Sequence, residues 1–173
     1  MAREIPDPVD WAKLVVALHT GLRRGEQCRL RWSEHVDFTT GIVTVADSKS
    51  GEPRHIPMND TVRAMLRALP SRLKSPWVLP SETGETPLDA QNFVNRVFLP
   101  ALGRAKIGDF HWLDLRHTLA SRLVMAGVDL RTVHELLGHK TLVMTLRYAH
   151  LSPEHPLEAA PESPEFRRRK YHR

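Results

Sequence analysis

Apolar residues recur at helical spacing near the start of the chain. They share one side of a helix predicted over 9–20: Trp11, Leu14, Val15 and Leu18. The Thr20-Gly21 pair interrupts this pattern, and a second short helix is predicted over 22–30. The chain is therefore expected to begin with two helices joined by a tight bend.

From Val36 onward the pattern becomes that of β-strands. Apolar, mostly β-branched residues gather at 42–45 and apolar residues again at 55–58, with Ser50-Gly51 between them. This arrangement predicts a small antiparallel sheet of three strands.

The remainder is predicted to be helical, apart from a loop over 71–88. Each helix is bounded by a capping or helix-breaking residue: Asn59 to Pro70, Asp89 to Phe98, Asp114 to Gly127, Asp129 to Gly138, and Thr141 to about His150. Pro100 is expected to kink or end the second of these helices. No βαβ alternation and no Gly-rich phosphate loop occurs. The predicted fold class is α+β, mainly α: a helical domain with a small three-stranded antiparallel sheet.

Composition and charge divide the chain into two parts. It has 173 residues and a formal net charge of +5, and the length fits one domain. Residues 152–165 are rich in Pro and Glu, and 167–173 are strongly basic. We therefore expect a folded domain over 1–151 and a flexible tail over 152–173. The tail could attract phosphates nonspecifically or simply aid solubility.

Other classes of protein are disfavoured. Cys28 is the single cysteine, which excludes an internal disulfide and a thiolate zinc cluster. The sequence has neither the roughly 20 consecutive apolar residues that cross a bilayer nor an apolar signal segment at its start. We expect a cytoplasmic protein that does not contact membranes.

One arginine falls on an apolar helix face. At 100° per residue, Arg116 lies at 100°, inside the apolar arc that runs from Leu115 at 0° to Val124 at 180°. A guanidinium group stays charged, so an inward position requires an anion. Two partners remain open at this point: an internal carboxylate, for which Glu26 is a candidate, or the phosphate of a ligand.

A tyrosine near the end of the domain is placed differently. On the helix predicted from Thr141, Leu142 and Leu146 share one face, and Tyr148 lies about 120° from its centre. Tyr148 is therefore expected outside the core, where His139 could border the same cavity. The alternative is a surface tyrosine and a turn histidine with no joint role.

Four short stretches carry a further pattern. They are Thr20-Gly21-Leu22-Arg23-Arg24-Gly25-Glu26, Leu113-Asp114-Leu115-Arg116-His117-Thr118, Leu136-Leu137-Gly138-His139, and Tyr148. Their order and spacing resemble the catalytic domain of the tyrosine recombinases, the phage integrase family, over about residues 9–151. The resemblance implies an enzyme that breaks and rejoins double-stranded DNA through a link between tyrosine and a 3′ phosphate, without a cofactor or metal.

The resemblance also implies roles for individual residues. Tyr148 corresponds to the nucleophile, whose phenol has a reference pKa near 10 and needs help to lose its proton. Arg23 and Arg116 correspond to the pair that grips the nonbridging phosphate oxygens.

Three further residues have counterparts in the family. Lys49, at the tip of the predicted hairpin, corresponds to the lysine that protonates the departing 5′ oxygen, although hairpin tips often carry lysine for solubility. His139 corresponds to the histidine that hydrogen-bonds a phosphate oxygen in the transition state. Glu26 corresponds to the acid beside the first arginine, and we expect it to position that arginine.

The chain departs from the family at Leu113, where the pattern usually has His and sometimes Lys. Leucine can neither accept nor donate a proton. His111 and His117 are nearby, but neither is expected to point in the same direction. Loss of a general acid or base typically costs about 100- to 10,000-fold in rate, so attenuated activity is expected.

Family members usually carry an additional N-terminal helical domain, and we expect it to be missing here because the sequence begins almost at the helices of the catalytic domain. Two hypotheses follow: an attenuated DNA recombinase, or a noncatalytic DNA-binding remnant or regulator. A histidine-based metalloenzyme is disfavoured because no HExxH or similar ligand set appears. By resemblance, we expect a monomer in the absence of DNA and a tetramer on it.

Overall fold

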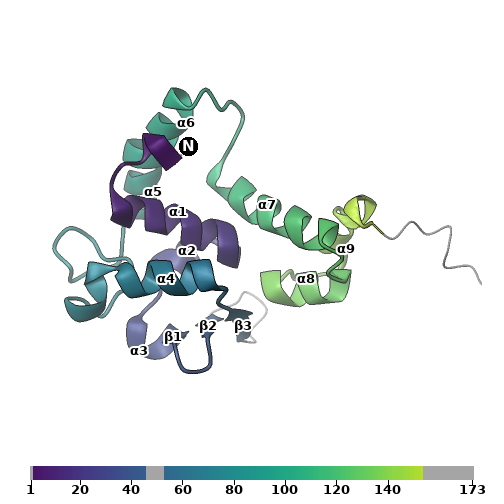
Figure 1. Ribbon diagram of the computed structural model, residues 1–173, viewed down its shortest axis with the longest axis horizontal. Coiled ribbons are helices and arrows are strands. Elements are labelled where there is room, and N and C mark those ends of the chain that lie inside the picture. The colour runs from purple at the N-terminus through teal and green to yellow at the C-terminus, as the bar shows by residue number, and fades with distance from the viewer. Residues whose placement is uncertain (1, 46–52, 154–173) are drawn as a thin grey trace, which may run out of the picture.

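The computed structural model describes residues 2–45 and 53–153 (Figure 1). The α-helices of this part are α1 (Pro8–Thr20), α2 (Arg24–Cys28), α3 (Trp32–His35), α4 (Asp60–Ala68), α5 (Ala90–Phe93), α6 (Leu99–Arg104), α7 (Trp112–Met125), α8 (Leu130–Leu137) and α9 (Val143–Leu146). Short helical segments of other types are η1 (Ala2–Glu4), η2 (Pro70–Leu73), η3 (Val94–Phe98) and η4 (Ala149–Leu151). The strands are β1 (Val36–Asp37), β2 (Ile42–Val45) and β3 (Arg54–Pro57). The predicted α+β, mainly α, fold class is confirmed.

The central helix is α1, which lies above α4 and the sheet and to the left of α7 in Figure 1. The Asp7 side chain caps it by accepting hydrogen bonds from the backbone N–H groups of Val9 and Asp10. Gly21 ends it in the left-handed conformation, at a φ of +62°. The helix packs against both α4 and α7, so it is buried on opposite sides. This explains why its apolar positions exceed one stripe.

The three strands form one antiparallel sheet in the order β1-β2-β3, as predicted. Val43 pairs with Ile56, and Val45 pairs with Arg54. Alternation along the strands directs these four side chains to the buried face of the sheet. A charged residue, Arg54, therefore points inward from β3.

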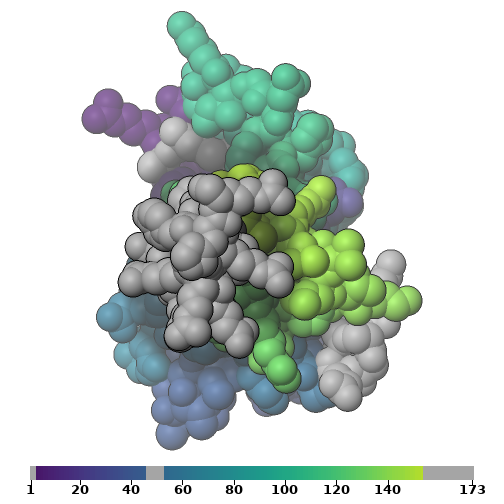
Figure 2. Space-filling model, turned by 90° about the vertical axis from the view of Figure 1, so that its right-hand side faces the viewer, coloured from purple at the N-terminus to yellow at the C-terminus, as the bar shows by residue number. Residues whose placement is uncertain are grey.

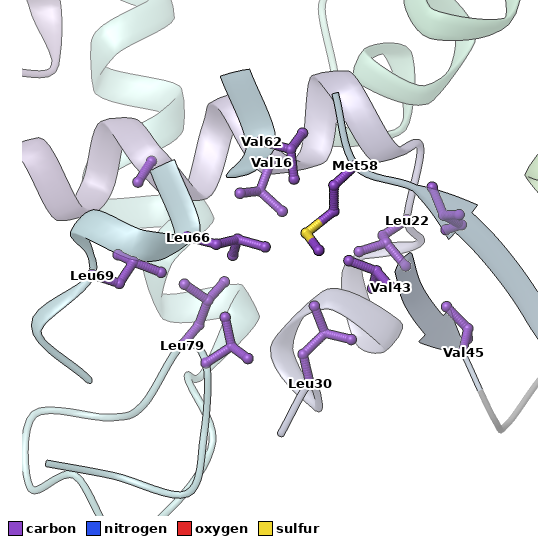
Figure 3. Close-up of a cluster of buried hydrophobic side chains, with 13 residues drawn as sticks. Val16, Leu22, Leu30, Val43, Val45, Met58, Val62, Leu66, Leu69 and Leu79 are labelled. Carbon is purple, nitrogen blue, oxygen red and sulfur yellow. The ribbon is translucent and has the colours of Figure 1, made fainter. Parts of the chain in front are cut away.

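The largest core cluster fills the space between α1, α4 and the sheet (Figure 3). Its members are buried apolar residues from these elements and from the segments that join them: Ala12, Val16, Leu22, Leu30, Val43, Val45, Ile56, Met58, Val62, Leu66, Leu69, Val78 and Leu79. The predicted helix after Asn59 is confirmed, and the Asn59 side chain accepts a hydrogen bond from the N–H of Val62.

A second cluster covers the other side of α1. There Leu14 and Ala17 pack with Phe98, and Leu115 joins them from α7. The helical segment after Asp89 does not end at Pro100: the π-helical turn η3 leads directly into α6, of which this proline is the second residue.

The C-terminal helices differ in part from the prediction. α7 begins at Trp112, not Asp114: His111 is the N-cap residue, and the Asp114 carboxylate accepts a hydrogen bond from its backbone N–H at 2.6 Å. α8 follows the predicted Asp129 cap and ends at Gly138, at a φ of +59°. The third predicted helix is wrong in length, since α9 spans four residues and begins after Leu142.

Within residues 2–45 and 53–153, no helix has the length and apolar character needed to cross a membrane. The same residues contain no group of three or more His, Cys, Asp or Glu side chains placed to hold a metal ion. Cys28 is buried and unpaired, and burial raises the pKa of its thiol to about 11.

Candidate active site

The end of α8 brings together side chains from segments far apart in the sequence. Arg23 precedes α2, Arg116 lies on α7, His139 follows α8 and Tyr148 follows α9. Lys49, the fifth predicted residue, lies outside the described residues. Four of the five predicted positions can therefore be located, and they converge on one region of the molecule.

Arg116 is buried, as its position on the apolar face of α7 predicted, with 5% of its surface exposed. Its Nη1 donates to the backbone oxygen of Gly21 at 2.6 Å, and its Nη2 donates to the backbone oxygen of Leu137. These oxygens lie at the C-terminal ends of α1 and α8, where the helix dipoles are negative. Burial, followed by the charges of Arg23 and Arg54, lowers the pKa of Arg116 to about 10.

The internal carboxylate suggested for Arg116 serves two other arginines. Glu26 Oε1 accepts from Arg23 Nη1 at 2.7 Å and from Arg54 Nη1 at 3.0 Å. Its Oε2 accepts from the backbone N–H of Arg23 at 2.8 Å and from Arg54 Nη2 at 2.5 Å. Burial alone would raise the pKa of Glu26, but the hydrogen bonds from Arg54 and Arg23 outweigh it and lower this pKa to about 2.

Arg23 also reaches the end of α8. Its Nη2 donates to the backbone oxygen of Gly138 at 2.7 Å. Arg23 and Arg116 therefore hydrogen-bond two consecutive carbonyls, those of Gly138 and Leu137. Neither guanidinium uses all of its five N–H donors in these contacts, so donors remain available for an anion.

Arg54 was not among the predicted residues, although it is 7% exposed and pairs with Glu26. It also packs against the end of α8: a Cβ at Gly138 would lie 2.9 Å from Arg54 Cδ. The signal for it in the sequence was the strand alternation, which places Arg54 on the same face as Ile56.

His139 is held beside the arginines in a neutral form. It is 9% exposed, and its Nδ1 lies 2.8 Å from Thr145 Oγ1. Burial, followed by the charge of Arg116, lowers its pKa to about 4. Thr145 was also missed by the sequence analysis, and its burial is complete.

The prediction that Tyr148 lies outside the core is wrong. It is 6% exposed and packs with Val124, Val133 and Leu137. The physical reason is that α9 ends at Leu146, so helical spacing from Thr141 does not determine its direction. Burial raises the pKa of the Tyr148 phenol, although the charges of Arg147 and Arg116 act in the opposite sense.

Leu113 and the two neighbouring histidines differ from one another in position. Leu113 lies in the first turn of α7 and is 55% exposed. His111 is exposed at the helix N-cap, beside Asp114. His117 lies one turn beyond Leu113, and its Nδ1 is 2.5 Å from the Tyr148 hydroxyl oxygen. The expectation that neither histidine is suitably directed is therefore wrong for His117, because residues i and i+4 share a helix face.

Comparison with known proteins identifies the family of this chain. Residues 7–155 match the Phage integrase family. The chain belongs to this family, the tyrosine recombinases, as the four sequence stretches predicted.

Individual relatives cover most of this chain. The integrase of Salmonella phage P22 is 35% identical over 156 residues, which are 83% of this chain and 40% of that protein. The tyrosine recombinase XerC of Xanthomonas campestris pv. campestris is 33% identical over 149 residues, 84% of this chain and 45% of that protein. The chain thus spans less than half the length of these two curated relatives.

A solved structure shares the fold. The Tn1549 transposon integrase, in complex with a circular intermediate DNA, superimposes with a TM-score of 0.73 at 20% sequence identity. The match covers 87% of this chain and 56% of that chain.

Proposed function

We propose that residues 1–151 form the catalytic domain of an enzyme that breaks and rejoins double-stranded DNA at specific sites, with Tyr148 as the nucleophile. The observation that carries this proposal is the placement of Arg23 and Arg116 on consecutive carbonyls at the end of α8. Tyr148 packs against Leu137, which provides one of those carbonyls. The presence of two guanidinium groups and a phenol near the end of α8 supports a site that binds and attacks a phosphodiester.

The reaction uses these groups as follows. The phenolic oxygen of Tyr148 forms a bond to phosphorus, the bond from phosphorus to the 5′ oxygen breaks, and the phenol proton passes to a base. The N–H groups of Arg23 and Arg116 stabilise the charge on the nonbridging oxygens. By resemblance, His139 hydrogen-bonds one of these oxygens, and Lys49 donates a proton to the 5′ oxygen. Attack of a 5′ hydroxyl on the phosphotyrosine reverses the sequence and rejoins the strand.

The internal ion pairs fit this role. The Glu26 carboxylate accepts hydrogen bonds from the side chain and the backbone N–H of Arg23, and it also accepts from Arg54. These contacts support Glu26 as the residue that fixes Arg23 before DNA arrives. An arginine side chain that is already held in one conformation loses little conformational entropy when phosphate binds.

The partner we propose is double-stranded DNA. The fold of the Tn1549 integrase, solved with DNA, and the names of the integrase and recombinase relatives support this. We further propose a monomer in the absence of DNA and self-association on DNA, up to a tetramer, in the cytoplasm. Figure 2 looks onto the C-terminal segments, where Leu142, Val143 and Met144 offer exposed apolar surface for such contacts.

Leu113 is the reason to expect attenuated activity. It offers no proton donor or acceptor at a position where the family usually has one. The resulting alternative is a DNA-binding remnant or regulator without turnover, and the following experiment separates it from the enzyme.

The experiment is covalent capture on suicide DNA. Duplexes with a randomised central segment carry a nick, so that the short 5′-hydroxyl fragment diffuses away after cleavage and the adduct accumulates. We expect an adduct that resists detergent and whose phosphotyrosine maps to Tyr148 by mass spectrometry. Tyr148→Phe abolishes it without weakening DNA binding, and Leu113→His increases its rate. DNA binding by the parent chain without any adduct refutes the enzyme and supports the remnant.

A further inference from the structure

The contact between His117 and Tyr148 joins two segments that are 31 residues apart in sequence. His117 lies on α7, directly after Arg116, and Tyr148 lies between α9 and η4. Consecutive residues on a helix are rotated by about 100°. Arg116 is therefore directed to the end of α8, while His117 is directed to the phenol oxygen.

The environment of His117 favours a neutral imidazole. Burial, followed by the positive charge of Arg147, lowers the pKa of His117, and Asp114 acts in the opposite sense. The charge of Arg116 also lowers this pKa. A neutral imidazole has one nitrogen that accepts, and a buried phenol is protonated and can donate. When the imidazole proton is on Nε2, the Tyr148 O–H donates this hydrogen bond and His117 Nδ1 accepts it.

We propose that His117 is the proton acceptor for Tyr148, serving the function that Leu113 cannot serve. This inference rests on the proposed function. In the step, the phenol O–H bond breaks and an N–H bond forms at Nδ1, while an oxygen electron pair forms the bond to phosphorus. The electrons of the P–O5′ bond leave with the 5′ oxygen, which takes its proton from the general acid of the proposed function. The resulting imidazolium returns the proton to the phenol when the strand is rejoined.

The position of His117 explains how this replacement is possible. Residues four apart on an α-helix lie on the same face, about 6 Å apart along the axis. A histidine at Leu113 would lie in the exposed first turn of α7, whereas His117 lies one turn deeper. The direct contact at 2.5 Å places it within reach for proton transfer without a bridging water.

The first test measures adduct formation by His117→Asn on suicide DNA that the parent chain cleaves. Asparagine can place an oxygen where Nδ1 lies, but it cannot take the proton at neutral pH. We expect the rate at saturating DNA to fall about 100- to 10,000-fold with DNA affinity nearly unchanged. His111→Asn, at the exposed start of α7, is the matched control and should leave the rate unchanged. An unchanged rate for His117→Asn overturns the inference while leaving the proposed function intact.

The pH profile gives a readout that a merely structural role would not change. The parent rate should fall with acid as Nδ1 becomes protonated, below the ordinary histidine pKa of 6.5 because that pKa is lowered. In His117→Asn this acid limb disappears, and the rate should rise with pH as the phenol ionises unaided. Retention in the variant of an acid limb at the same pH as in the parent, and above the titration of His139 near pH 4, overturns the inference.

A second measurement does not depend on cleavage or on the folding of a variant. Nitrogen NMR of the parent chain should show His117 at neutral pH with an unprotonated Nδ1 and a protonated Nε2. A protonated Nδ1 overturns the inference even if the parent chain forms an adduct. If Nδ1 is unprotonated but the parent forms no adduct on any bound DNA, the proposed function fails, and the catalytic role of His117 fails with it.

Discussion

Glu26→Gln tests how the site is held together, because glutamine has the shape of a protonated glutamate. In the folded chain the Glu26 carboxylate accepts four hydrogen bonds from two arginines. Its side chain is 10% exposed and that of Arg54 is 7% exposed. The variant leaves Arg23 and Arg54 facing each other without a carboxylate between them.

The magnitude follows from the pKa of Glu26. Folding lowers it from 4.5 to about 2. One pKa unit corresponds to about 1.4 kcal/mol, so the carboxylate stabilises the fold by about 3 kcal/mol relative to its neutral form. Because the folded pKa is the lower one, this contribution is fully present above pH 4.5 and is lost as the pH falls through about 2. Linkage leaves about 1 kcal/mol of it at pH 3.

Urea unfolding at pH 7 and pH 3 measures the effect. The free energy of unfolding of Glu26→Gln should lie about 3 kcal/mol below that of the parent at pH 7 and about 1 kcal/mol below it at pH 3. The denaturant slope should stay unchanged, which confirms that both proteins unfold by the same transition.

Glu34→Gln is the matched control. Glu34 pairs with Arg31 at 3.1 Å, and both side chains are largely exposed. Exposed pairs contribute about 0–1 kcal/mol, so this variant should unfold nearly as the parent does. A loss below about 1 kcal/mol for Glu26→Gln at pH 7, or a difference that does not shrink at pH 3, would refute the reasoning.

Two further predictions concern neighbouring residues. Gly138→Ala should lower the free energy of unfolding, measured in urea, by more than Gly84→Ala does. Both glycines have positive φ, but only at Gly138 would the new Cβ meet Arg54, at 2.9 Å from Cδ. Equal losses would show that the Arg54 side chain moves aside without destabilising the fold. His139 should titrate with a midpoint near pH 4 in proton NMR, because burial and the charge of Arg116 lower its pKa to about 4. The fold should therefore lose stability as the pH falls below 6.5. A midpoint at or above pH 6.5 contradicts this prediction.

Much of the fold could be predicted because it follows from local signals. The cap at Asn59, the glycine end of α8 and the alternation in β2 are each encoded by adjacent residues. The inward direction of Arg116 was predictable for the same reason, since helical spacing alone places it among leucines. Its partners were not, because Gly21 and Leu137 approach it only through tertiary packing.

Tyr148 shows where local reasoning fails. The prediction extended one helix from Thr141 to about His150, and in that helix the tyrosine would face away from the core. The chain instead forms α9 and η4 with Tyr148 between them. The Thr145 hydroxyl contacts His139, and Leu146 is exposed. Side-chain contacts that form only after folding thus override the helical pattern.

The carbonyls at the end of α8 have a consequence for the order of events during synthesis. Arg23 and Arg116 are made early, but the peptide groups that orient them belong to residues 137 and 138. A nascent chain that has emerged only as far as α7 already contains Glu26 and Gly21, which bind Arg23 and Arg116, but it lacks these two carbonyls. The hydrogen bonds of both arginines are complete only when the last turn of α8 docks, and Tyr148 follows Gly138 by ten residues in the sequence. The contacts of the two arginines and the nucleophile are therefore completed close together, near the end of the synthesis of this domain.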